Sequence, residues 1–137
     1  MVTTDTRTNT ETVLTVEDLR TYFTTRWGTV KAVDGISFDL RRGETLGIVG
    51  ESGCGKTTAG RSILRLTPAQ AGRVFFDGVD LMTLDAAALR SYRRQVQIIF
   101  QDPTASLNPR MRVRDSVAEG MQSFGIGEDE AERTARV

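Results

Sequence analysis

Histidine is absent from this sequence, and cysteine occurs only once, at Cys54. The absence of histidine excludes every mechanism that uses an imidazole from this chain. A single cysteine cannot form an internal disulfide, which suits a reducing cytoplasm. No apolar run approaches the roughly 18 residues that a membrane-spanning helix needs. The chemistry of the chain must therefore come from its backbone and from other side chains.

Neither sign of charge is in excess, because 18 basic residues balance 18 acidic ones. Bulk electrostatics therefore give no reason to expect a nucleic acid or an acidic membrane surface as a partner. The 137 residues leave room for one domain. Residues 1–12 are polar, rich in threonine and without the apolar core of a signal peptide. We expect a short disordered lead-in there, followed by a domain at residues 13–137.

Residues 50–57 fit the phosphate-loop pattern G-x-x-x-x-G-K-[S/T] at every required position. The loop follows a short apolar run at 46–49 and opens a helical pattern, which is the context that makes such a match credible. Backbone N–H groups of this kind of loop surround phosphate oxygens at the N-terminus of a helix. We therefore expect a nucleotide to bind at Gly50, Glu51, Ser52, Gly53, Cys54, Gly55, Lys56, Thr57 and Thr58.

Four residues of the loop have distinct expected roles. Lys56 would reach the β- and γ-phosphates, the hydroxyl of Thr57 would bind Mg²⁺, and Thr58 would lie toward the α-phosphate. Lys56 is one of only two lysines among 18 basic residues, and a compact ammonium fits at this position where a guanidinium would not. Cys54 would contribute only its backbone N–H, although alkylation of a thiol at this place would block the nucleotide.

Hydrophobic periodicity predicts a mixed α/β domain in which antiparallel strands precede a strand–loop–helix unit. The ligand belongs at the carboxyl end of the apolar strand 45–49. The helix behind the loop places Ala59, Ile63 and Leu66 on one side and stops at Pro68. The other expected elements are strands at 13–19, 36–40, 74–76, 79–81 and 96–100, an Asp77-Gly78 turn, and helices at 84–94, 113–124 (capped by Gly125) and 128–137 (with Asp129–Arg133 and Glu132–Arg136 pairs).

From about Leu14 to its last residue, the chain resembles the nucleotide-binding subunit of an ABC transporter. Four stretches carry the resemblance: 32–38 with 42–44, the phosphate loop, 72–81, and 98–103 with 106–111. The last stretch, Ile98-Ile99-Phe100-Gln101-Asp102-Pro103 and then Ser106-Leu107-Asn108-Pro109-Arg110-Met111, is the most specific. It is similar to the Q-loop of importers of oligopeptides, dipeptides and nickel. The resemblance implies the N-terminal part of an ABC-type P-loop NTPase core with an antiparallel β subdomain.

The resemblance also implies roles for residues outside the loop. Gln101 matches the Q-loop glutamine, which in the family contacts Mg²⁺ and the attacking water; an amide can accept from water and donate to phosphate without adding charge. Phe23 matches the aromatic residue that stacks on adenine, with Tyr22 as second choice, although an ordinary exposed or core aromatic explains Phe23 almost as well. Asp102 and six arginines between Arg90 and Arg114 face either a permease or solvent.

The function implied by the resemblance is ATP-driven import of peptides or nickel across the cytoplasmic membrane. The cofactors would be ATP and Mg²⁺. The partners would be transmembrane permease subunits, a second ATPase subunit and, indirectly, a solute-binding protein. The chain would then lie peripherally on the cytoplasmic face of the membrane.

Several parts of the family pattern are missing from this sequence. No LSGGQ-like signature is present, no apolar strand ending in Asp-Glu follows Gln101, and there is no switch histidine. We therefore expect a fragment that lacks the C-terminal half of the family fold. It would hydrolyse ATP slowly at most, because positioning the water and stabilising the transferred charge supply most of the acceleration. A strand at 46–49 without its neighbour would also promote aggregation.

Two other functions stay open on the sequence. The first alternative is an inert remnant that at most binds nucleotide. The second is another P-loop enzyme, such as a GTPase or a small-molecule kinase. The guanine-reading pattern Asn-Lys-x-Asp does not occur, which disfavours the GTPase.

Overall fold

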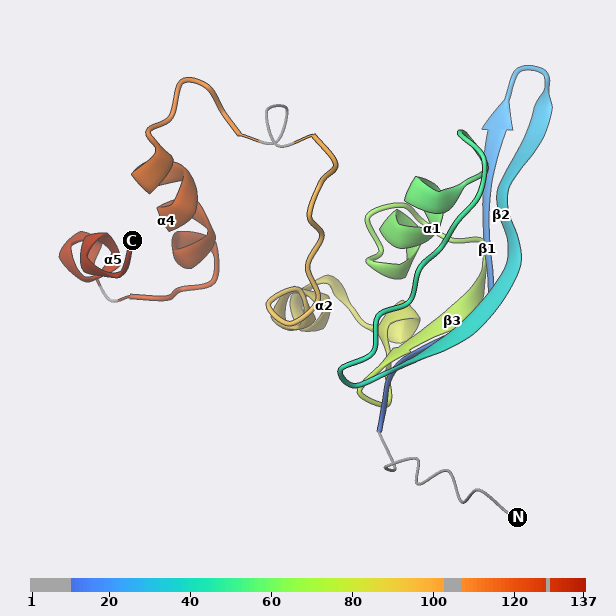
Figure 1. Cartoon of the computed structure of the whole chain (residues 1–137), viewed down its shortest axis with the longest axis horizontal. Coiled ribbons are helices and arrows are strands. Elements are labelled where there is room, and N and C mark those ends of the chain that lie inside the picture. Colours follow the sequence, from blue (N-terminus) through green and yellow to red (C-terminus); the bar gives the residue numbers. More distant parts are fainter. Residues whose placement is uncertain (1–10, 103–106, 128) are drawn as a thin grey trace, which may run out of the picture. The chain divides into compact units, whose positions relative to one another are not determined.

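A computed structural model of the chain describes residues 11–102, 107–127 and 129–137 (Figure 1). These residues form two compact units, one ending at Arg93 and one beginning at Arg94, and each unit is described by itself. No helix within these ranges is long and apolar enough to cross a bilayer. Most of the expected lead-in lies outside the described residues, but its last residue, Thr12, already begins the first strand.

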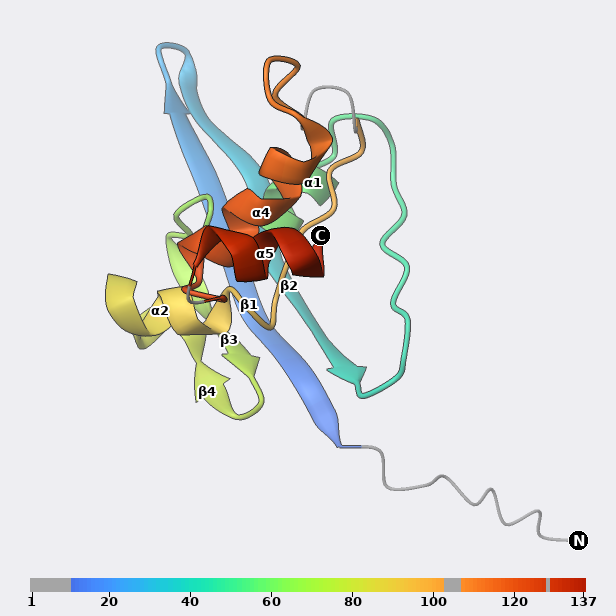
Figure 2. The ribbon, with the colours of Figure 1, turned by 90° about the vertical axis from the view of Figure 1, so that its left-hand side faces the viewer.

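The first unit is built on a four-stranded antiparallel sheet. Its strands are β1 (Thr12–Thr25), β2 (Gly28–Arg41), β3 (Ala71–Phe76) and β4 (Val79–Asp80), in the order β2-β1-β3-β4 (Figure 2). β1 and β2 are longer than predicted because they pair along their whole length as one hairpin. Asp77 and Gly78 have φ angles of 46° and 79°, which confirms the predicted Asp-Gly turn between β3 and β4.

Helices occur in both units. The first unit holds α1 (Lys56–Ile63), the 3-10 turn η1 (Leu81–Thr83) and α2 (Ala86–Tyr92). The second unit holds α4 (Val113–Ser123) and α5 (Glu130–Arg136). Gly125 ends α4 as predicted, with a φ of 64° and an N–H that donates to the carbonyl of Gln122 at 3.1 Å.

Aspartate caps make two of these helices shorter than predicted. The side chain of Asp85 accepts from the N–H of Ala88 at 2.7 Å, so α2 begins after Asp85, and Leu81 belongs to η1 instead of the preceding strand. Asp129 caps α5 in the same way and does not form the predicted ion pair with Arg133. The other predicted pair, Glu132–Arg136, is confirmed at 2.5 Å.

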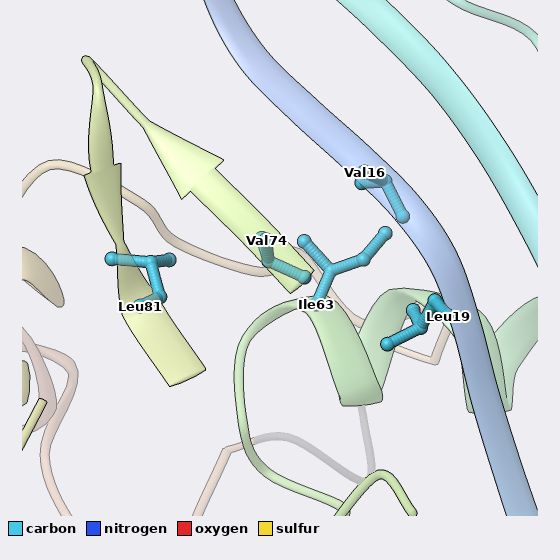
Figure 3. Close-up of a cluster of buried hydrophobic side chains, with 5 residues drawn as sticks. All are labelled: Val16, Leu19, Ile63, Val74 and Leu81. Carbon is cyan, nitrogen blue, oxygen red and sulfur yellow. The ribbon is translucent and has the colours of Figure 1, made fainter. Parts of the chain in front are cut away.

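The core of the first unit lies between α1 and the sheet. Its buried members come from both strands and helices (Figure 3): Val16, Leu19, Ile63, Val74 and Leu81. Beside this apolar cluster, the hydroxyls of Thr21 on β1 and Ser62 on α1 lie 2.8 Å apart, and both residues are completely buried. Apolar burial holds α1 against the sheet, and the hydroxyl pair sets its position along β1 because a buried hydroxyl needs its partner.

α1 ends five residues before Pro68, which corrects the predicted boundary. Arg65 has a φ of 52°, the left-handed conformation that closes many helices. Its N–H donates to the carbonyl of Ser62 at 3.0 Å, and the N–H of Leu66 donates to Arg61 at 2.8 Å. This pair of bonds is the Schellman motif. The sequence did not predict this motif because its left-handed position usually holds glycine, and here it holds Arg65.

Two predicted strands are not formed. Residues 45–49 and 96–100 have no strand pairing, and Val49 and Ile99 expose 93% and 98% of their surface. A strand needs a neighbour for its N–H and C=O groups, and neither run joins the sheet among the described residues. Both runs were predicted as buried because they are apolar. They remain extended segments with exposed apolar side chains.

The face of the β1–β2 hairpin opposite α1 carries a chain of charged contacts. Tyr22 donates its hydroxyl to Asp34, and Lys31 pairs with the same carboxylate at 3.1 Å. Arg20 pairs with Asp18 at 3.0 Å. The hydrogen bond from Tyr22, and then that from Lys31, hold the pKa of Asp34 below its ordinary value. The carboxylate of Asp34 in turn raises the pKa of Lys31.

Replacing Asp34 by Asn should lower stability near neutral pH but not in acid. The folded-state pKa of Asp34 lies below its ordinary 3.8, so its carboxylate stabilises the fold above that pH and loses this effect as the pH falls through the folded pKa. Urea midpoints of the wild type and Asp34→Asn should therefore differ near neutral pH and converge below pH 3.8. A difference of constant size down to the lowest pH would contradict this expectation.

Candidate functional site

The phosphate loop leads from the extended run 45–49 into α1, and most of it is exposed. Gly53 and Gly55 have φ angles of 79° and 96°, which side chains rarely allow. The N–H of Cys54 donates to the carbonyl of Glu51 at 3.3 Å and closes the turn. The loop is therefore bent around its own centre immediately before the helix, as a phosphate cradle requires.

Gly55 lies directly against the backbone of β2. A Cβ atom on Gly55 would lie 2.0 Å from the carbonyl oxygen of Ala32, far inside any tolerated contact. The pairing of β1 and β2 is irregular at this place: Thr21 pairs with Val33, whereas Tyr22 pairs with Lys31. Ala32 is thus the extra residue of a β-bulge, a feature that often occurs beside functional sites. Sequence reasoning missed Ala32, because pairing register does not show in a single strand's pattern.

The N-terminus of α1 is open. Its N-cap, Gly55, has no side chain to accept a hydrogen bond, and its first turn contains no acidic residue. α2 and α5 instead carry aspartate caps at Asp85 and Asp129; α4 also lacks a side-chain cap, but no glycine-rich loop precedes it. The first N–H groups of a helix have no partner within the helix. Those of α1 are available to an anion.

Lys56 folds over the loop. Its ammonium donates to the carbonyl of Gly50 at 2.9 Å and to that of Glu51 at 2.6 Å, and it lies 3.5 Å from the sulfur of Cys54. An ammonium has three N–H donors and no acceptor, so two carbonyls fix its place and one donor remains, directed at most to a weak sulfur acceptor. Cys54 is exposed, and the effect of its alkylation stays a prediction.

The two threonines that follow Lys56 occupy the first turn of α1. Thr57 is exposed and Thr58 is half-buried. A hydroxyl is a suitable oxygen ligand for Mg²⁺, and the open helix end and the ammonium suit a triphosphate. The residues present therefore fit ATP with Mg²⁺.

The structure separates the two candidates for adenine stacking. Phe23 follows the buried Leu19 and Thr21 in the alternation of β1, so it lies on the face that carries α1, and 43% of its surface is exposed. Tyr22 lies on the other face, bonded to Asp34 and with the ammonium of Lys31 5.4 Å from its ring centre. Phe23 keeps the better position for a base at the loop, and its role stays a prediction.

The remaining predicted residues belong to the second unit or are divided between the units. Gln101 lies at an exposed bend of the second unit, and its contact with Mg²⁺ stays a prediction. Arg90 and Arg93 belong to the first unit, whereas the other four arginines of that series belong to the second. Asp102 is exposed, and the predicted Pro103 to Ser106 stretch lies outside the described residues.

The family model for ABC transporters matches residues 33–137. The chain belongs to the ABC transporter family. Three curated relatives are ATP-binding proteins of peptide import or peptide transport. A putative peptide import ATP-binding protein of Brucella ovis is 52% identical over 124 residues, which cover 90% of this chain and 39% of the relative. The oligopeptide transport protein OppF of Bacillus subtilis is 50% identical over 129 residues, 93% of this chain and 42% of the relative.

The dipeptide transport protein DppF of Lactococcus lactis is 52% identical over 112 residues, covering 80% of this chain and 36% of the relative. This member of the ABC transporter family therefore spans about two fifths of the length of the curated relatives it matches.

Solved structures confirm the fold. The dimeric ABC transporter cassette MJ0796 superposes with a TM-score of 0.73 at 21% identity, over 90% of this chain and 53% of that one. The protein cbiO1 of Clostridium perfringens, part of an ABC transporter complex, gives a TM-score of 0.69 at 28% identity, over 92% of this chain and 47% of that one. The ABC ATPase fold with its antiparallel sheet, predicted from the sequence, is thus confirmed.

Replacing Gly55 by Ala should destabilise the first unit by about 2 kcal/mol or more, because the new Cβ would strain the backbone and meet a carbonyl oxygen. Urea unfolding measures the loss. Gly60→Ala is the matched control: Gly60 lies within α1, nothing lies within 4 Å of its added Cβ, and alanine favours a helix. Equal stability of Gly55→Ala and wild type would show that the contact with Ala32 does not exist in solution.

Proposed function

We propose that this chain is the nucleotide-binding part of an ATP-binding subunit that couples ATP hydrolysis to the import of peptides across the cytoplasmic membrane. One observation carries the proposal: an uncapped helix begins behind a glycine-rich loop that holds the ammonium of Lys56 on the carbonyls of Gly50 and Glu51. Membership of the ABC transporter family supports ATP as the nucleotide. The names of the curated relatives support peptides as the solute, and the resemblance leaves nickel as the alternative.

The described groups of the loop have separate tasks in this proposal. The free N–H groups at the start of α1 bind phosphate oxygens, because the helix end is positive and uncapped. Lys56 is held in place before the ligand arrives, which reduces the ordering that binding requires. When bound, ATP would supply the phosphoryl group for transfer to water, and Mg²⁺ would neutralise charge on the phosphate oxygens. Thr57 would be a ligand for Mg²⁺, and Phe23 would stack on adenine. The family role of Gln101 stays a prediction for the second unit.

We further propose that the second unit contacts a permease subunit. An apolar hollow of about 300 Å³ lies between the described end of the 106–111 stretch and α4; its lining includes Leu107, Pro109, Met111, Val113 and Val117. Arg110 and Arg112 are exposed beside it. An apolar hollow with basic flanks suits an amphipathic partner helix that carries acidic groups. This contact would place the chain peripherally on the cytoplasmic face of the membrane, with a second ATPase subunit and a solute-binding protein in the assembly.

A second candidate function is nucleotide binding without turnover. The sequence contains no apolar strand ending in Asp-Glu after Gln101 and no histidine, so this polypeptide does not itself supply a water-polarising carboxylate of the family type. On this view the loop binds Mg-ATP while phosphate release stays close to the uncatalysed rate. Steady turnover by the isolated polypeptide would exclude this candidate in favour of the first.

Lys56→Ala should reduce the affinity for Mg-ATP by about tenfold or more, because it removes a charge-assisted contact to the phosphates. Isothermal titration calorimetry on the folded chain measures the affinity, with GTP as the competing nucleotide and Lys31→Ala as the matched control. Lys31 is the only other lysine, and its partner is Asp34 on the opposite face of the hairpin. Undiminished binding by Lys56→Ala, or a preference for GTP, would refute the proposed function.

A further inference from the structure

Arg65 occupies a position that normally belongs to glycine. It is the left-handed residue after α1, with a φ of 52°, and an arginine has no conformational advantage there. In the corresponding position after α4 the chain places Gly125. A residue that keeps an unfavourable backbone conformation indicates that its side chain has a task.

The side chain of Arg65 joins α1 to the segment that follows β4. One terminal nitrogen, Nη1, donates to the carbonyl of Leu81 and to the carbonyl of Leu84, both at 2.7 Å. These two carbonyls bracket η1, and the second lies immediately before Asp85, the N-cap of α2. The guanidinium is partly buried, and charged donors at this distance form strong hydrogen bonds.

We infer that Arg65 is a positioning residue that transmits nucleotide binding from α1 to α2. The inference rests on the proposed nucleotide binding at the loop. A ligand on the first turn of α1 immobilises the helix, and α1 is short enough to move as one rigid body. Arg65 connects the far end of that body to the start of α2. Local opening at the start of α2 that displaces Leu84 must then break the bond from Arg65 on an immobilised helix, so the ligand suppresses this opening.

Apolar contacts also hold α2 against the sheet, independently of Arg65. Leu89 is buried, and the ring of Tyr92 packs edge-on against Phe76 with ring centres 6.2 Å apart. If these apolar contacts alone held α2, nucleotide binding would slow its exchange equally well without Arg65. The guanidinium and the core contacts therefore predict different results when only the guanidinium is removed.

Hydrogen–deuterium exchange of the full chain, with and without Mg-ATP, tests the inference in the segment 84–93. In the wild type, nucleotide should slow exchange of these amides about fivefold or more, the lower end of typical coupling between sites. Arg65→Gly removes the guanidinium and also relieves the left-handed backbone. This variant should stay folded and bind Mg-ATP with unchanged affinity. In it, however, the nucleotide should slow the exchange of amides 84–93 by less than about twofold. Arg65→Met should show the same loss of coupling with a larger loss of stability.

The control is Arg61→Met, which removes an exposed arginine of the same helix and keeps both bonds of Arg65. It should retain the full wild-type effect. Equal nucleotide protection in Arg65→Gly and wild type would overturn the inference, as would the absence of protection in a wild type that binds Mg-ATP. A wild type that shows no calorimetric binding would instead refute the proposed function, and the inference with it.

Discussion

The approach of the phosphate loop to the sheet depends on the missing side chain of Gly55. The backbone of this residue touches the carbonyl of Ala32, and only a residue without Cβ fits there. The bulge at Ala32 matters equally, because it places the carbonyl of Ala32 against Gly55 of the loop. Loop and sheet are therefore fitted to each other by backbone alone. The φ of 96° at Gly55 then directs the chain into α1 with its first N–H groups uncovered.

Beyond this contact, α1 is fixed by polar bonds at its far end. The hydroxyl of Ser62 meets Thr21 on β1, and Arg65 reaches past η1. Apolar burial would hold the helix against the sheet but would tolerate sliding, since it has no direction. Directional bonds remove that freedom. The proposed phosphate site would thereby be ordered before any ligand arrives, which lowers the entropy cost of binding a flexible triphosphate.

The sequence predicted the fold class and the features that depend on a few neighbouring residues. The Asp77-Gly78 turn and the Gly125 helix end were correct because each is a local motif. Residues 50–57 are a local motif of the same kind, and their structure is a glycine-rich turn before a helix, whereas nucleotide binding there stays a prediction. The predictions of strands at 45–49 and 96–100 were wrong because a buried strand needs neighbouring strands that are distant in the sequence. An apolar run alone does not show whether such neighbours exist. The end of α1 was misplaced because Arg65 takes a conformation that residue type disfavours. The bulge at Ala32 depends on the register between two strands and leaves no signature in either.

The hydroxyl pair in the core has an evolutionary consequence. Thr21 and Ser62 are both fully buried and lie 2.8 Å apart. Losing one hydroxyl leaves the other dry and unsatisfied, which costs more than losing both together. Single substitutions at either position are therefore disfavoured steps, whereas a paired change to apolar side chains of similar size is nearly neutral. Divergent members of the family should carry either both hydroxyls or neither, and the two alignment columns should covary.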